Sequence, residues 1–256
     1  MKSIVRIAVL CTGLALASTA CKQARQQSSP ATDAAPIKAE PQPPPARPAA
    51  AKEPDPSPGA MAAAGTAWSF DADRPGEPPT GFAFGLTGSG PRGRWEIMAD
   101  PGAPSRGHVL AQLDADDTDF RFPIAVADAV QPANVRVSVR CKMVSGVVDQ
   151  ACGLVVRYQD EDNYYITRAN ALEGNIRLYH VQSGNRRQLA SWSGVVQAGV
   201  WHDYAFEAVG DLLQVFWNGT RIIDHRDMTF AQGGRIGVWT KADSVTYFDD
   251  LRVGNP

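Results

Sequence analysis

Alternation of apolar and polar side chains between Trp68 and Val253 is the feature that most limits how this chain can fold. In segment 135–140 valine alternates with arginine or serine, and segments 154–158, 176–181 and 213–217 repeat this period of two. A period of two is typical of strands that bury one face. No window of about 11 to 18 residues shows convincing helical spacing. The sequence therefore predicts an all-β domain.

Turn residues separate the alternating segments. Asn218-Gly219 lies between DLLQVFW and TRIID and is a strong signal for a two-residue hairpin. Glu173-Gly174, Ser183-Gly184-Asn185 and Gly233-Gly234 divide other segments in the same way. The series predicts about ten or more short antiparallel strands, which is typical of a two-sheet sandwich or a barrel.

The first twenty residues predict export. Lys2 and Arg6 form a basic start, and the apolar run from Ile7 to Ala17 is too short to span a bilayer. Small residues at 18–20 supply a processing point. Residues 1–20 are therefore interpreted as a signal peptide, and the protein is expected outside the cytoplasm.

Cys21 follows the signal directly, and this arrangement resembles the lipobox of bacterial lipoproteins, although Ser18 stands where that family has leucine. The resemblance implies that the Cys21 thiol carries lipid and is the only membrane contact. Lys22 in place of aspartate implies the outer membrane by the same family's sorting rule, so an outer-membrane or periplasmic lipoprotein is expected. The alternative is ordinary cleavage after Ala20, which leaves a soluble protein with an unpaired thiol.

Residues 21–66 are predicted to be a disordered tether, and residues 67–256 a single domain. Ten of the nineteen prolines lie between Pro30 and Pro58, with few large apolar residues to offset the entropy of ordering. Without residues 1–20 the chain keeps 23 basic and 27 acidic side chains, a net charge of −4. This balance gives no reason to expect a nucleic-acid partner.

Two cysteines remain in the predicted domain, Cys141 and Cys152, on consecutive predicted strands around a turn near Ser145-Gly146. An oxidising compartment permits a disulfide across that hairpin. Two small buried apolar residues are the alternative.

No catalytic residues can be assigned from the sequence. Glycoside hydrolysis usually needs two carboxyl groups that flank the bond, and the strand pattern Glu-x-Asp-x-x-Glu is absent. The acidic clusters at 114–119 and 160–162 resemble solvated turns, with calcium as a weaker alternative because calcium takes several oxygen ligands from loops.

Polar and aromatic side chains on neighbouring predicted strands are the candidate ligand site. Tyr165, Arg168, Asn170 and Tyr179 come from two adjacent segments, and Arg157 lies on the preceding one. A sheet would bring several of them onto one face, where tyrosine could stack on a sugar ring and polar groups could bind hydroxyls. An ordinary polar sheet face is the alternative.

Three segments carry a family resemblance: CGLVVRYQDEDNYYITRANALEGNIRLYHV, GVWHDYAFEAVGDLLQVFWNGTRII and GGRIGVWTKADSVTYFDDLRV. They resemble the concanavalin A-like lectin/glucanase superfamily, and more narrowly its LamG-like and 3-keto-disaccharide hydrolase (DUF1080-type) domains, over roughly residues 68–254. The resemblance implies a jelly-roll sandwich. Residues 152–155 (CGLV) replace the Asn-Ser-Gly-Ile-type motif of the hydrolase-named members.

The resemblance also implies a structural calcium ion. In similar sandwiches an aspartate of the closing strand ligates calcium, and Asp249 is the matching position. Asp71 and Asp73, in the opening segment WSFDAD, would lie beside it if the terminal strands pair.

Three functions follow as hypotheses. The first is an envelope-anchored, non-catalytic module that binds a glycan or another surface polymer. The second is a glycoside hydrolase or lyase of the same fold. The third is a structural envelope protein without a small ligand.

Overall fold

The computed structural model describes residues 65–105, 107–128 and 134–256. Within these ranges the chain forms strands and no helix, so the predicted all-β class is confirmed. The same ranges hold no helix that is long and apolar enough to cross a membrane. The predicted signal peptide, the Cys21 lipidation site and nearly all of the tether lie outside the described residues.

The strands are β1 (Thr66–Trp68), β2 (Phe82–Gly88), β3 (Trp95–Ala99), β4 (His108–Gln112), β5 (Arg121–Ala127), β6 (Val135–Ser145), β7 (Ala151–Asp160), β8 (Asn163–Asn170), β9 (Asn175–Gln182), β10 (Asn185–Ser193), β11 (His202–Val209), β12 (Leu212–Trp217), β13 (Thr220–Arg226), β14 (Arg235–Trp239) and β15 (Val245–Gly254).

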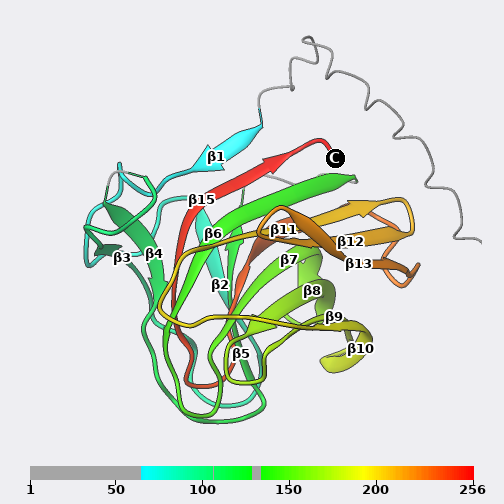
Figure 1. Cartoon of the computed structure of the whole chain (residues 1–256), viewed down its shortest axis with the longest axis horizontal. Coiled ribbons are helices and arrows are strands. Elements are labelled where there is room, and N and C mark those ends of the chain that lie inside the picture. Colours follow the sequence, from blue (N-terminus) through cyan, green and yellow to red (C-terminus); the bar gives the residue numbers. More distant parts are fainter. Residues whose placement is uncertain (1–64, 106, 129–133) are drawn as a thin grey trace, which may run out of the picture. The chain divides into compact units, whose positions relative to one another are not determined.

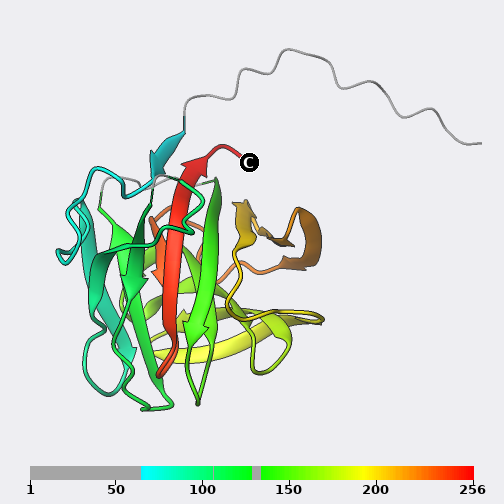
Figure 2. The same cartoon turned by 60° about the vertical axis from the view of Figure 1, so that its left-hand side comes forward.

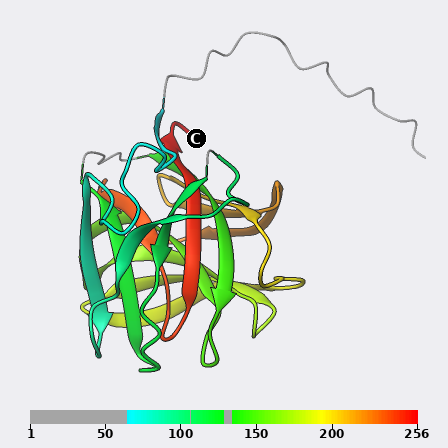
Figure 3. The same ribbon diagram turned by 90° about the vertical axis from the view of Figure 1, so that its left-hand side faces the viewer.

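These strands form two antiparallel sheets that pack face to face (Figures 1, 2 and 3). The eight-stranded sheet has the order β13-β12-β11-β6-β15-β4-β3, with β1 paired to the end of β15. The seven-stranded sheet has the order β10-β9-β8-β7-β14-β5-β2. This arrangement is the predicted two-sheet jelly-roll sandwich.

The predicted turns connect neighbouring strands. Asn218 and Gly219 join β12 to β13 with φ values of 48° and 80°. Ser183 and Gly184 join β9 to β10 with φ values of 50° and 74°. Two successive positive φ values are what a type I′ hairpin turn requires, which is why asparagine, serine and glycine occur there.

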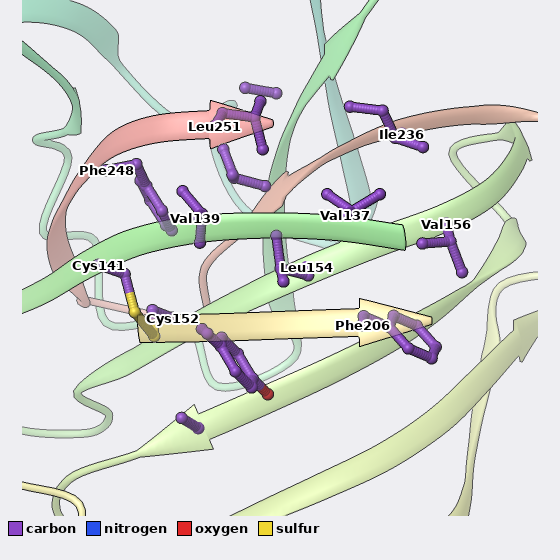
Figure 4. Packing of buried hydrophobic residues seen from close by; sticks show 14 of the residues in the cluster. Val137, Val139, Cys141, Cys152, Leu154, Val156, Phe206, Ile236, Phe248 and Leu251 are labelled. Carbon is purple, nitrogen blue, oxygen red and sulfur yellow. A yellow bond between two sulfur atoms is a disulfide. The ribbon is translucent and has the colours of Figure 1, made fainter. Parts of the chain in front are cut away.

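Alternate apolar residues of both sheets fill the space between them. Figure 4 shows Val137 and Val139 of β6 close to Leu154 of β7, and all three are at most 2% exposed. Burial of each side chain of this size stabilises the fold by roughly 1.5–3 kcal/mol. The apolar residues that recur with a period of two in the sequence therefore lie on the inner face of each sheet, and the two inner faces form one core.

A disulfide links Cys141 of β6 to Cys152 of β7, with 6.6 Å between the two Cα atoms (Figure 4). The disulfide forms, but the prediction that it joins the two strands of one hairpin was wrong. Strand β6 belongs to the eight-stranded sheet and β7 to the seven-stranded sheet, because residues 146–150 lead the chain from one sheet to the other. The bridge therefore joins the two sheets.

Candidate functional site

The outer face of the seven-stranded sheet carries a second buried cluster. Its members come from β5, β7, β8, β9 and β14 and are at most 6% exposed; they include Phe122, Ile124, Tyr158, Tyr164, Ile166, Tyr179 and Trp239. Because this face points away from the other sheet, its burial must come from the sheet itself. The seven-stranded sheet is curved, so that its outer face is concave and its side chains pack together.

Arg186 of β10 demonstrates the curvature. Its guanidinium carbon lies 4.6 Å from the ring centre of Tyr179 on β9 and 4.4 Å from that of Phe122 on β5. In a flat sheet β9 and β5, four strands apart, would be about 19 Å from each other. The guanidinium therefore covers an aromatic floor formed by distant strands, with Trp239 at 6.0 Å as the third ring.

The charge on Arg186 has no acidic partner in direct contact, and it interacts with Asp119 and Asp149 only at longer range. Among the described residues no carboxylate lies within ion-pair distance of it, and one terminal guanidinium nitrogen is buried without a hydrogen-bond partner. Burial lowers the pKa of Arg186. Cation–π contacts compensate part of the lost hydration, but they do not supply a hydrogen-bond acceptor.

Two further groups lie near the aromatic floor. The ring of Phe120 is 47% exposed and packs edge-on against Phe122, with 4.7 Å between ring centres. Lys241, from the β14–β15 connection, forms ion pairs with Asp119 and with Asp149. We call Phe120, Phe122, Tyr179, Arg186, Trp239 and Lys241 the Arg186 patch.

A buried ion network supports the patch from one side. Arg168 of β8 is 1% exposed and donates two hydrogen bonds to Glu173, at 2.8 and 3.0 Å. It also donates to Asn175 at 2.7 Å and lies 3.5 Å from Asp149. The Arg168 hydrogen bonds lower the pKa of Glu173 to about 2, whereas burial raises the pKa of Asp149.

The β6–β7 connection positions Asp149. The Asp243 carboxylate accepts hydrogen bonds from the backbone N–H groups of Val147, Val148 and Asp149. Gly146 begins the connection with a φ of 153°, and a Cβ there would lie 1.8 Å from the Asp149 carbonyl oxygen. Only glycine fits this close approach. The connection that begins at Gly146 thus places Asp149 in the ion network.

The predicted ligand residues are all buried and divide between the two faces of the sheet. Arg168, Asn170 and Tyr179 lie on the concave face, at most 4% exposed. Tyr165 faces the other sheet, where its hydroxyl donates to Asp227. Arg157 has a φ of 51°, so its side chain turns inward and donates to the carbonyl oxygens of Phe230 and Gly210.

Arg186 and Phe120 are absent from the residues predicted as ligand contacts. The two-residue turn at 183–184 fixes the β9–β10 register, which pairs Arg186 with Val181 on the same face as Tyr179. That register is readable from the sequence and would have identified Arg186. The contact with Phe122 could not have been identified, because it depends on the curvature of the sheet.

Asp71 and Asp249 meet at Ser105, as pairing of β1 with β15 predicts. The Ser105 hydroxyl lies 3.0 Å from one Asp249 oxygen and 3.4 Å from Asp71. Asp249 also accepts hydrogen bonds from the backbone N–H groups of Ser105 and Asp250, and burial raises its pKa. Asp249 therefore accepts its hydrogen bonds from Ser105 and Asp250, and the Asp71 carboxylate approaches the same Ser105 hydroxyl. Calcium there stays a prediction.

The acidic clusters form local turns. Asp114 pairs with buried Arg121 at 3.0 Å, and Asp116 accepts from the backbone N–H of Thr118. Asp160 accepts from the backbone N–H of Asp162. In the part of the chain that the structure describes, no group of three or more His, Cys, Asp or Glu side chains could hold a metal ion.

Two hollows lie elsewhere on the surface. One, of about 280 Å³, crosses the outer face of the eight-stranded sheet, and its three arginines each pair with a carboxylate: Arg136 with Glu207, Arg140 with Asp203 and Arg252 with Asp250. The other, of about 380 Å³, is lined by Gln159 and residues 228–232. Each arginine of the first hollow is neutralised by a carboxylate. The Arg186 patch differs because no carboxylate of the described residues forms an ion pair with Arg186.

No protein-family model matches the chain, and no curated protein matches its sequence. Solved structures do match it. The carbohydrate binding module CBM66 from Bacillus subtilis is 17% identical with a TM-score of 0.52, covering 69% of this chain and 96% of that one. The cellulose induced protein Cip1 is 9% identical with a TM-score of 0.52, covering 75% and 97%.

A Bacillus subtilis protein of unknown function with a galectin-like fold is 12% identical with a TM-score of 0.50, covering 68% of this chain and 89% of that one. At these identities the likeness concerns the fold alone. The chain therefore has the galectin-like, concanavalin A-like sandwich fold that its sequence resembles.

Proposed function

We propose that this protein is a carbohydrate-binding module and that the Arg186 patch binds the sugar. The observation that carries the proposal is that a half-exposed ring, Phe120, and a cation without a protein acceptor among the described residues, Arg186, both contact the ring of Phe122. The likeness to a solved carbohydrate binding module supports it at the level of fold.

The patch has the composition that sugar recognition needs. The exposed face of Phe120 offers an apolar surface to the C–H groups of a sugar ring. Arg186 supplies hydrogen-bond donors, and Asp119, with a side chain that is 79% exposed, supplies acceptors for hydroxyl groups. A few placed polar groups around aromatic surface are typical of small-molecule sites.

The carboxyl groups beside the patch favour binding over hydrolysis. Asp149 uses one oxygen for Lys241 and the other for Asn170 and Arg168. Glu173 uses both oxygens for arginine and asparagine donors. A glycosidase needs one carboxyl group to donate a proton and another to attack or activate water. The hydrolase and LamG-like assignments stay predictions.

Replacing Phe120 with alanine tests the proposal. We expect Phe120→Ala to weaken binding to an immobilised glycan about tenfold or more, because stacking surface is lost, while the folded state changes little since the ring is 47% exposed. Affinity electrophoresis and calorimetry of the full chain against a panel of neutral and acidic polysaccharides provide the measurement.

Met228→Ala is the matched control, since Met228 is 73% exposed and lines the hollow of about 380 Å³. It should bind like the unmodified chain. Absence of binding to every polysaccharide, or equal binding by Phe120→Ala, would count against the proposal.

We also propose, from residues 1–21, that lipid on Cys21 anchors the module in the envelope. Metabolic labelling with a radioactive fatty acid should mark the chain and leave a Cys21→Ser variant unlabelled. Labelling of both would refute anchoring at this residue.

A further inference from the structure

We infer that the ligand of the Arg186 patch is an acidic sugar whose carboxylate pairs with Arg186. The inference rests on the proposed function and names the class of sugar. It comes from one partly buried cation, Arg186, that lacks, among the described residues, the protein acceptors of the buried cations of the domain.

The other basic groups that are buried or partly buried near this face have protein acceptors. Arg121 pairs with Asp114, Arg168 with Glu173, and Lys241 with Asp149. Arg157 has no carboxylate, but its terminal nitrogens donate to two backbone carbonyl oxygens at 2.7 Å. Arg186 alone among these five has neither kind of acceptor in the described part of the chain.

Arg186 is partly buried, so its guanidinium loses part of its water and gains no acceptor among the described residues in exchange, and its place here requires a reason. The aromatic floor holds the guanidinium in place, with Phe122 and Tyr179 at 4.4 and 4.6 Å. A fixed, planar guanidinium that donates no hydrogen bond to the described residues suits a carboxylate, which accepts two parallel hydrogen bonds from the nitrogens that are not buried. Lys241 is neutralised by its ion pairs with Asp119 and Asp149, so Arg186 is the cation of the patch that is left for a ligand.

General electrostatic attraction does not account for such binding. The chain carries a net charge of −2, so an acidic polymer is repelled by the protein as a whole. Affinity for a uronic acid must therefore come from a local cation. Phe120 would contact the sugar ring to which the carboxylate is attached.

The test compares polymers that differ only in the acid group. The full chain is titrated with polygalacturonate, alginate and hyaluronan, and with the methyl ester of each polymer at matched salt. We expect esterification to weaken binding of at least one polymer by about 10- to 100-fold, since it removes a charge-assisted hydrogen-bonded pair. Dextran sulfate, as a sulfated probe, should bind no better than that ester.

Arg186→Gln should bring the ratio of acid to ester affinity close to one. Arg187→Gln should keep the ratio of the unmodified chain. Arg187 is the next residue on β10, is exposed and forms no ion pair with the described residues, so it controls for charge alone. Melting temperatures of both variants, measured alongside, separate loss of binding from loss of fold.

Equal binding of acid and ester forms of all three polymers, or stronger binding of dextran sulfate than of any uronate, would overturn the acidic-sugar inference and leave the binding module standing. If Arg186→Gln keeps the ratio of acid to ester affinity of the unmodified chain, the carboxylate does not pair with Arg186. Absence of binding to any glycan would remove both the inference and the proposed function.

Discussion

Arg168→Met should lower the free energy of unfolding by about 3–5 kcal/mol, because it leaves buried carboxylates without their cation. Arg168 is 1% exposed and holds Glu173 through two hydrogen bonds while also approaching Asp149. For a domain of this size the melting temperature should fall by roughly 10 °C. Urea and thermal denaturation measure both quantities.

Arg177→Met is the matched control. Arg177 lies directly opposite Arg168 in the β8–β9 register and pairs with the same Glu173, but its side chain is 34% exposed. An exposed ion pair contributes about 0–1 kcal/mol. If the two variants lose the same free energy of unfolding, burial of the network is not what stabilises this part of the sheet.

The loss caused by Arg168→Met should depend on pH. The pKa of Glu173 is lowered from 4.5 to about 2, so its ion pair stabilises the fold above about pH 4.5 and is lost as the pH falls towards 2. The difference in stability between the native chain and Arg168→Met should therefore narrow across that interval. If the difference in stability between the two proteins widens as the pH falls, the Arg168–Glu173 ion pair is not its cause.

Removing the inter-sheet disulfide should have the second large effect. With Cys141 and Cys152 both replaced by alanine, we expect a loss of about 3 kcal/mol, since the bridge closes a loop with a sequence separation of 11 residues. Reduction of the unmodified chain should give a similar loss in urea denaturation.

The stability of the double variant should not change on addition of reductant. This control separates reduction of the disulfide from other effects of thiol reagents. Mass spectrometry after alkylation under denaturing conditions counts the free thiols. Two reactive cysteines at 141 and 152 in the purified protein, together with stability that reductant does not change, would show that the bridge does not form.

Local sequence patterns predicted the fold because each strand and turn is specified by its own residues. The alternation in segment 135–140 places Val137 and Val139 in the core, and Asn218-Gly219 adopts the φ values that its hairpin needs. Assignment of strands to sheets was less predictable. The connection at 146–150 changes sheets, and nothing in its residues distinguishes it from an ordinary hairpin.

The candidate site was predicted in part. Arg168 and Asn170 lie on the concave face as part of the ion network, and Tyr179 lies there as a ring of the Arg186 patch. Arg157 was misplaced because a single positive φ turns its side chain inward, and strand alternation cannot reveal such a bulge. The contact of Arg186 with Phe122 depends on strands far apart in the sheet order, so only the folded chain shows it.

A titration of the ¹⁵N-labelled chain with oligogalacturonate, followed by NMR, tests the central claim most directly. Binding at the Arg186 patch predicts that the largest shifts occur at the amides of Phe120, Arg186 and Lys241 and at the indole N–H of Trp239. Shifts confined to the groove of about 280 Å³ on the other sheet, at Arg136, Arg140 and Phe216, would contradict it.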